Sequence, residues 1–303
     1  METIINLPVG QMNKELPKTL VYKEAPEITV LNRSIAHPSR SDKYSVIKSG
    51  EIVKWFESKG FTSKIIAKEN PRKGGGYEGY ETHFIAFENP NLVIPNEELA
   101  KEITPRIYIK NSYHGRSKFG VFIGLFRGWC ENGLVFGDFS ESLQFRHRGV
   151  TEEDLELLLQ NVKRKYEEEM IPYVLNLKGI KLSRDEQIAF AKTILDYRLS
   201  DVIEKKGENF IGADYETLLT VNRKEDVGND LWLVCQRIQE NLGLNENKPV
   251  SLEYQFWKKD KNGERIQDSR KVSHVSNINR SIDLNSKIFE EANKFLHNQA
   301  VAA

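Results

Sequence analysis

The sequence predicts an α+β fold, in which an antiparallel sheet flanked by helices is followed by a helical region and a C-terminal β-hairpin plus helix. Short strand-like segments succeed one another between residues 63 and 147, and their short connections favour antiparallel pairing. From Gly149 onward, apolar residues recur at helical spacing instead. Near the C-terminus, the pair Asn262-Gly263 separates two alternating segments, which is typical of a two-residue hairpin turn.

These patterns divide the chain into three parts. Four prolines in the first forty residues favour an extended arm over residues 1–43, with one short strand near Ile28–Leu31. Residues 44–148 form the predicted sheet core with one N-terminal helix. Residues 149–303 form the helical region with the hairpin and last helix, which we expect to pack on the same core. A chain of 303 residues is long enough for one large domain or two modest ones.

The predicted sheet core begins with a helix over Tyr44–Lys59, which Gly60 ends. Strands are then expected at Ser63–Lys68, Tyr80–Glu88, Arg106–Asn111, Lys118–Phe126, Leu134–Phe136 and Leu143–His147. In Lys118–Phe126 both alternating sets of side chains are apolar or small. This segment is therefore predicted to be a central strand that is covered on both faces.

The helical region contains two capping signals and one apparent stop. Thr151 and Asp154 predict a helix that Pro172 ends, and Ser183 with Glu186 predicts a second helix as far as Leu199. The later elements are a helix carrying Val227 to Leu242, strands over Val250–Phe256 and Arg265–Val275, and a helix over Asp283–His297.

Charge is balanced overall but uneven along the chain, which has 44 basic and 44 acidic residues. Residues 40–76 hold nine basic and four acidic residues, and residues 101–148 hold eight and four. Residues 149–226 reverse the balance, with twelve against seventeen. A basic front and an acidic middle suit an anionic ligand or self-association, and ordinary solvated faces would give the same counts.

The two cysteines, Cys130 and Cys235, lie in no ligand-spaced cluster, so no metal or other cofactor is predicted. Cys130 as a nucleophile would need His114 or His147 nearby as a base; an inert, buried thiol after Trp129 is the simpler interpretation. No catalytic residue is therefore predicted, and an enzyme is not favoured. The N-terminus lacks a signal-peptide pattern and no run of eighteen apolar residues occurs, so we expect a cytoplasmic protein without membrane contact.

Basic and aromatic residues gather in two loops and at strand ends. The loop Asn70–Gly79 is glycine-rich but lacks a nucleotide-binding motif, which leaves a hairpin loop or a contact with a nucleic-acid backbone. The turn Asn111–Gly120 contains a His-Gly-Arg sequence, which is often no more than an exposed turn. The candidate nucleic-acid-binding residues are Arg72, Lys73, Tyr77, His114, Arg116, Lys118, Arg127, Arg146 and Arg148.

The segment NSYHGRSKFGVFIGLFRGWCENGLVF resembles the signature of a phage- and plasmid-borne family catalogued as domain of unknown function nine-three-two. The matching residues are Asn111, Ser112, Gly115, Cys130, Asn132 and Gly133, with Trp129 in place of the usual small aliphatic residue. The resemblance extends from about Tyr44 to the end. It implies a mobile-element protein in a bacterial cytosol that acts on DNA or against host systems, and it brings no catalytic residues. The strand order is also similar to that of Rad52-like annealing proteins, at the level of fold alone.

Two functions lead as hypotheses, and a hydrolase that uses Cys130 is a third, less favoured one. The first is a non-enzymatic phage or mobile-element protein that binds single-stranded DNA in annealing or recombination, as a homo-oligomer. The second is an anti-defence protein that binds and inhibits a host defence complex, which balanced charge and an acidic helical half would suit.

Overall fold

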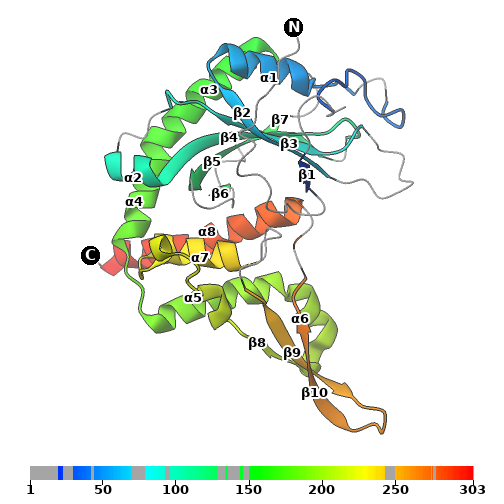
Figure 1. Ribbon diagram of the computed structural model, residues 1–303, viewed down its shortest axis with the longest axis vertical. Coiled ribbons are helices and arrows are strands. Elements are labelled where there is room, and N and C mark those ends of the chain that lie inside the picture. Colours follow the sequence, from blue (N-terminus) through cyan, green and yellow to red (C-terminus); the bar gives the residue numbers. More distant parts are fainter. Residues whose placement is uncertain are drawn as a thin grey trace. The chain divides into compact units, whose positions relative to one another are not determined.

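The computed structural model describes residues 20–22, 30–41, 44–69, 79–92, 96–115, 117–127, 134–135, 144–145, 150–242, 250–273, 275 and 278–302. The chain divides into two compact units, Met1–Pro172 and Tyr173–Ala303 (Figure 1). The first unit holds an antiparallel sheet with helices, and the second holds helices with a small sheet. This confirms the predicted α+β class.

The sheet of the first unit consists of β1 (Leu20–Tyr22), β2 (Thr62–Glu69), β3 (His83–Glu88), β4 (Ile103–Asn111), β5 (Phe119–Arg127), β6 (Leu134–Val135) and β7 (Gln144–Phe145). Its order is β1-β2-β3-β4-β5-β6, every pairing is antiparallel, and β7 pairs with the start of β5. Strand β5 is thus internal. Phe119, Val121 and Ile123 are buried, as are Gly120 and Gly124 on the opposite face, which confirms that both faces of this strand are covered.

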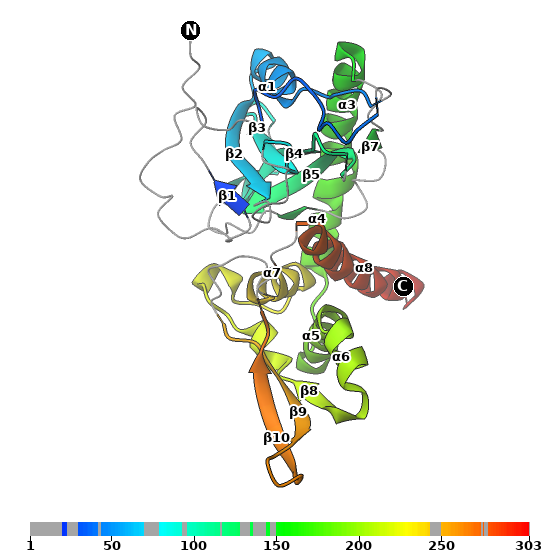
Figure 2. The ribbon, with the colours of Figure 1, turned by 90° about the vertical axis from the view of Figure 1, so that its right-hand side faces the viewer.

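Three helices belong to this sheet: α1 (Ser49–Ser58), α2 (Glu97–Glu102) and α3 (Glu152–Lys165). Helix α1 buries Ile52, Val53 and Phe56, and the Phe56 ring stacks on Phe87 of β3 at 4.6 Å. Helix α3 begins with the predicted capping box of Thr151 and Asp154. Figures 1 and 2 show α1 and α3 beside the sheet of their own unit.

Several expectations for the first unit were wrong. Helix α1 starts at Ser49 and not at Tyr44, because residues 44–48 make tertiary hydrogen bonds instead: Tyr44 Oη donates to Ser112 O at 2.9 Å, and Ile47 O accepts from Asn111 Nδ2 at 2.7 Å. Of the strand expected near Ile28–Leu31, residues 28–29 lie outside the described residues and residues 30–32 form a turn. The short helix α2 was not predicted.

Pro172 does not end the helix that Thr151 begins. A π-helical turn, Tyr166–Met170, follows α3, and α4 (Ile171–Gly179) continues through the proline. The backbone N–H of Ile171 donates to Tyr166 O, five residues back. This widened turn precedes the proline, whose ring and missing N–H a regular helix would not accommodate. Helix α3 also falls within the first compact unit, whereas the predicted helical region began at Gly149.

The second unit contains α5 (Arg184–Arg198), α6 (Ser200–Lys206), β8 (Phe210–Ala213), α7 (Leu231–Asn241), β9 (Glu253–Lys259), β10 (Arg265–Lys271) and α8 (Ile278–Ala302). Single 3-10 turns lie at Gly207–Asn209, Glu216–Leu219 and Lys224–Asp226. The strands form a sheet of order β10-β9-β8. Every residue of helix α7 except Leu233 is buried, including Trp232 and Cys235, so this helix forms the centre of the unit.

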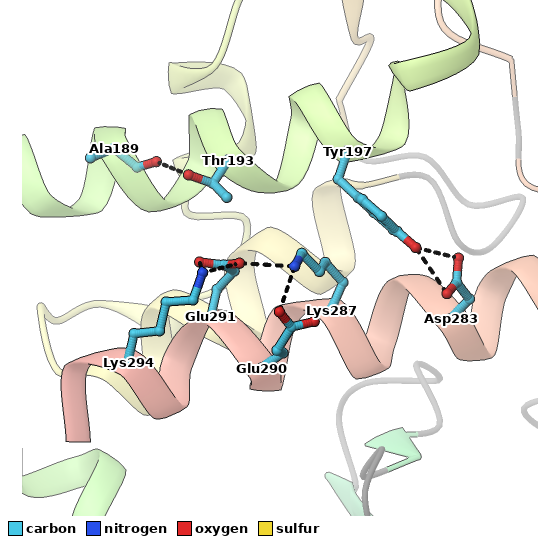
Figure 3. Close-up of polar contacts among 8 residues, drawn as sticks. All are labelled: Ala189, Thr193, Tyr197, Asp283, Lys287, Glu290, Glu291 and Lys294. Carbon is cyan, nitrogen blue, oxygen red and sulfur yellow. Dashed lines mark hydrogen bonds and ion pairs between the residues drawn. The ribbon is translucent and has the colours of Figure 1, made fainter. Parts of the chain in front are cut away.

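Polar contacts fix α8 against α5 (Figure 3). The Tyr197 hydroxyl lies 3.0 Å from both carboxylate oxygens of Asp283. Along α8, Lys287 contacts Glu291 at 3.0 Å and Lys294 contacts the same carboxylate at 2.6 Å. The Glu291 side chain is 9% exposed, so the two lysines neutralise a nearly buried charge.

The second unit also departs from expectation in its details. Helix α7 begins after Asp230, whose Oδ1 accepts from Leu233 N at 2.9 Å, and Val227 stays outside it, 67% exposed. Helix α6 and strand β8 were not predicted, and α8 is longer at both ends. In the hairpin, Asp260 N donates to Glu264 O at 2.9 Å, and only Gly263 takes a positive φ, of 85°. The turn therefore has three residues with a glycine bulge instead of two.

Candidate nucleic-acid interface

The Asn-Ser turn at the end of β4 is a structural junction. Asn111 Nδ2 donates to Ile47 O at 2.7 Å and to Ser49 Oγ at 2.9 Å, which holds the segment before α1. Ser112 Oγ donates to Ser117 O at 3.0 Å and closes the turn itself. Both side chains are buried, so these two signature residues support the fold and do not face a ligand.

A serine and a histidine meet beside this turn. Ser49 Oγ lies 2.7 Å from His83 Nε2, and His83 Nδ1 lies 2.9 Å from Glu81 O. A carbonyl can only accept, so Nδ1 carries the proton and Nε2 accepts from the serine. Both residues are 0% exposed. A pair that no substrate can reach is structural, although its spacing would suit nucleophilic catalysis.

Gly115 completes the turn in a conformation that suits glycine. Its φ is 70°, and a Cβ at this position would lie 3.0 Å from Arg40 Cδ and 3.2 Å from Tyr44 Cε2. The glycine thus allows the chain around residue 40 to approach the end of the sheet.

A cluster of basic and aromatic side chains lies over this junction; we call Arg33, His37, Arg40, Tyr44 and Tyr80 the arginine–tyrosine cluster. The Arg33 guanidinium lies 4.0 Å from the centroid of the Tyr80 ring, and its Nε donates to Gly79 O at 3.1 Å. The His37 ring meets Tyr80 edge-on at 4.9 Å. The chain is anchored here because His37 N donates to Tyr113 O at 2.9 Å.

The cluster continues through Ser39. His37 Nδ1 lies 2.8 Å from Ser39 Oγ, to which Arg40 Nη2 donates at 3.2 Å. Arg40 is exposed, and the other four cluster residues are partly exposed. In the part of the chain that the structure describes, no salt bridge involves Arg33 or Arg40. Their charges are therefore available at a surface that also presents rings.

Tyr44 contributes a fixed ring to this surface. Partial burial raises the pKa of its hydroxyl to about 12, although nearby Arg40 acts in the opposite direction. The hydroxyl therefore stays protonated at neutral pH and donates to Ser112 O. This hydrogen bond holds the ring beside Arg40.

The structure describes only some of the residues that the sequence singled out. His114 is 5% exposed, so its ring lies in the interior of the turn and not on a surface. Lys118 is exposed just before β5, and Arg127 ends that strand. The remaining candidates, Arg72, Lys73, Tyr77, Arg116, Arg146 and Arg148, lie outside the described residues, as do Cys130, Asn132 and Gly133.

Sequence reasoning missed most of the cluster. Arg33, His37 and Arg40 lie among prolines and serines, without periodicity, in a segment that we assigned to an extended arm. Tyr80 was predicted to begin a strand and was not among the candidate binding residues. The available signal was the density of basic and aromatic residues from Arg33 to Tyr44, which does not show where the segment folds.

The described residues offer little support for other chemistry. No group of three or more His, Cys, Asp or Glu side chains among them could hold a metal ion. Burial raises the pKa of the Cys235 thiol far above its usual value, so this cysteine is not a nucleophile. No described helix is long and apolar enough to cross a membrane.

Comparison with known proteins identifies relatives of this chain. Two proteins of Escherichia coli (strain K12), UPF0380 protein YafZ and UPF0380 protein YfjQ, are each 28% identical to this chain over 213 residues. The matched region covers 68% of this chain and 70% of each relative. No solved structure matches the chain.

A family model gives broader coverage. The family described as Domain of unknown function (DUF932) matches residues 36–292. The match includes every residue of the cluster except Arg33, and all signature residues from Asn111 to Gly133. It confirms the resemblance seen in the Asn-Ser and Cys-x-Asn-Gly segments: the chain belongs to the DUF932 family.

Proposed function

We propose that this protein binds single-stranded DNA through the arginine–tyrosine cluster, as a non-enzymatic protein of a phage or another mobile element. The observation that carries the proposal is the contact of Arg33 with the Tyr80 ring at 4.0 Å, beside an exposed Arg40 that no described carboxylate neutralises. Proteins that bind single strands combine cationic side chains for the phosphates with rings on which bases stack.

The arrangement favours a single strand over a duplex at this surface. Tyr44 and Tyr80 are half-buried rings held by hydrogen bonds and by neighbouring cations, so they offer fixed aromatic surface. A base can stack on such a ring only when it is unpaired or displaced from its own stack. Arg33 and Arg40 would meanwhile neutralise the phosphates on either side of that base.

The biological role that we assign is annealing or recombination by a homo-oligomer. The support is the order of helix and antiparallel strands in the sequence, which resembles that of Rad52-like proteins, and the uneven charge of the chain. A mass measurement in solution tests the oligomer.

The second hypothesis, inhibition of a host defence complex, needs no DNA contact, so a DNA titration separates the two.

The test is fluorescence anisotropy of a labelled single-stranded oligonucleotide with the full chain. Arg40→Ala should weaken binding, because it removes a positive charge that would contact a phosphate. The side chain is exposed and hydrogen-bonds to the neighbouring Ser39, so its replacement should disturb the fold little. Arg164→Ala is the matched control: it removes the same charge from an exposed arginine of α3, which pairs with Glu168 at 3.1 Å. Equal affinities for the two variants would contradict the assignment of the site.

A further inference from the structure

The hairpin of the second unit has a face that none of the preceding functions uses. Strands β9 and β10 pair over seven residues each, from Glu253 opposite Lys271 to Lys259 opposite Arg265. Strand β8 pairs only with residues 254–256 of β9. Beyond Phe256 the sheet is therefore a two-stranded ribbon, and Figures 1 and 2 both show it extending past β8 and α6 of its own unit.

One face of the hairpin belongs to the core of the second unit. Tyr254 and Phe256 are buried, and the Tyr254 ring stacks with Phe210 of β8 at 6.3 Å. The ammonium group of Lys206 lies 3.4 Å from the centroid of the Phe256 ring. Further along this face, Lys258 pairs with Asp268 at 2.8 Å, so its charge is neutralised.

The opposite face is solvent-facing and basic. We define the ribbon face by its residues, of which two are half-buried and the others are exposed: Glu253, Gln255, Trp257, Lys259, Arg265, Gln267, Ser269 and Lys271. Alternation along each strand and the pairing register place these side chains together. Two side-chain contacts agree with this placement: Gln267 Nε2 donates to Gln255 Oε1 at 2.7 Å, and the Arg265 guanidinium lies 5.0 Å from the centroid of the Trp257 ring.

Protection of an edge strand does not account for this composition. Charged side chains on an edge, lysine in particular, prevent pairing with other chains, but this protection requires neither a tryptophan nor a pair of amides. Here Lys259, Arg265 and Lys271 are all basic, and Glu253 is the one acid that shares their side of the described hairpin. A large half-exposed tryptophan between them adds apolar surface, which edge protection would avoid.

We propose that the ribbon face binds double-stranded DNA in the major groove. A two-stranded ribbon fits a B-form major groove of about 12 Å width, and seven residues span roughly 23 Å along it. At the turn end of the face, Lys259 and Arg265 have no acid opposite them and would contact phosphates, whereas Lys271 at the other end lies opposite Glu253. The paired amides of Gln255 and Gln267 lie between these ends, and amide side chains hydrogen-bond to adenine edges.

The same geometry predicts that an RNA duplex does not bind at the ribbon face. The major groove of an A-form RNA helix is deep and narrow, so a ribbon cannot enter it. The proposal stands apart from single-strand binding at the arginine–tyrosine cluster, because it uses other residues in the other compact unit. Experiment can therefore contradict either proposal without contradicting the other.

The experiment measures affinity of the full chain for a DNA duplex, an RNA duplex of the same sequence and the single DNA strand. The test variant is Lys259→Glu with Arg265→Glu. Its control, Lys205→Glu with Lys224→Glu, makes the same charge change at exposed positions of the same unit. All four positions are exposed, and far-UV circular dichroism with thermal unfolding confirms that each variant is folded.

We expect the test variant to lose roughly tenfold or more in affinity for the DNA duplex, while its affinity for the single strand stays within about twofold. The control should match the wild type, and the RNA duplex should bind more weakly than the DNA duplex. The proposal is overturned if the wild type does not bind the DNA duplex. It is equally overturned if test and control variants bind the duplex alike, if duplex and single-strand affinities fall together, or if both duplexes bind equally.

Discussion

The Tyr166 hydroxyl reaches from the π turn after α3 to the centre of the sheet, where it lies 2.8 Å from the carbonyl oxygen of Gly124 in β5. Its second partner is the carbonyl of Arg106 in β4. Burial raises the pKa of Tyr166 well above its usual value, so the group remains a donor across the accessible pH range.

Tyr166→Phe should therefore destabilise the protein. The loss of one hydrogen bond to two buried carbonyls is expected to cost about 1–2 kcal/mol in the free energy of unfolding. Tyr215→Phe is the control, because its hydroxyl contacts Asp196 at 3.0 Å at a more exposed site. Urea denaturation measures both, and an equal or smaller loss for Tyr166→Phe would show that the bridge between α3 and the sheet is not important for stability.

Gly115→Ala should disturb both stability and the arginine–tyrosine cluster. The positive φ of 70° is strained for alanine, and the new methyl group meets Arg40 Cδ at 3.0 Å. We expect a loss of about 1 kcal/mol or more. The matched substitution is Gly179→Ala, where a Cβ meets nothing within 4 Å and φ is not positive. Thermal unfolding compares them; a Gly115→Ala protein as stable as Gly179→Ala would contradict the strained turn.

The two capping boxes should give a contribution to stability that depends on pH. Hydrogen bonds from Thr151 lower the pKa of Asp154 below 3.8, and hydrogen bonds from Ser183 lower that of Glu186 below 4.5. A carboxyl whose pKa is lower in the folded state stabilises that state above its unfolded pKa. The contribution disappears as the pH falls through the folded value.

The wild type should therefore be more stable than Asp154→Asn and Glu186→Gln at neutral pH, and the difference should vanish on acidification below these pKa values. Chemical denaturation at a series of pH values measures the difference. Glu204→Gln, which removes an exposed carboxylate of α6 outside both boxes, is measured alongside as the control for the loss of one negative charge. A stability difference that persists unchanged at acidic pH would mean that the caps stabilise the helices through packing and neutral hydrogen bonds, and not through the charge of the carboxylate.

Cys235 should be unreactive in the folded protein. The thiol is buried in α7, and burial raises its pKa, so almost no thiolate forms at pH 8. In a Cys130→Ser background, a thiol reagent should label the chain only at the rate of unfolding. Labelling that is rapid in native buffer and unaffected by denaturant would contradict the burial of this helix.

Local signals predicted the parts of the fold that depend on local chemistry. The capping box at Ser183 and the uninterrupted apolar segment of β5 both appear where the sequence placed them, because each is defined within a few residues. Pro172 misled the prediction, because a π turn and a long-range hydrogen bond from Tyr166 carry the helix past it.

The candidate site was harder to predict, for the same physical reason. Arg33 and His37 meet Tyr80 because His37 N donates to Tyr113 O and because Gly115 allows the segment around residue 40 to approach the sheet. No periodicity in the sequence brings these segments together. Conversely, His114 looked like an exposed turn residue, and the packing around Asn111 and Ser112 buries it.

The most direct test of the account is the salt dependence of binding to a single-stranded oligonucleotide. The logarithm of the binding constant should fall linearly with the logarithm of salt concentration, by about 0.7 for each phosphate that is neutralised. Arg40→Ala should reduce that slope by about one contact, and Arg164→Ala should leave it unchanged. The absence of binding at low salt with micromolar protein, or a slope that Arg40→Ala does not alter, would contradict single-strand binding at the arginine–tyrosine cluster.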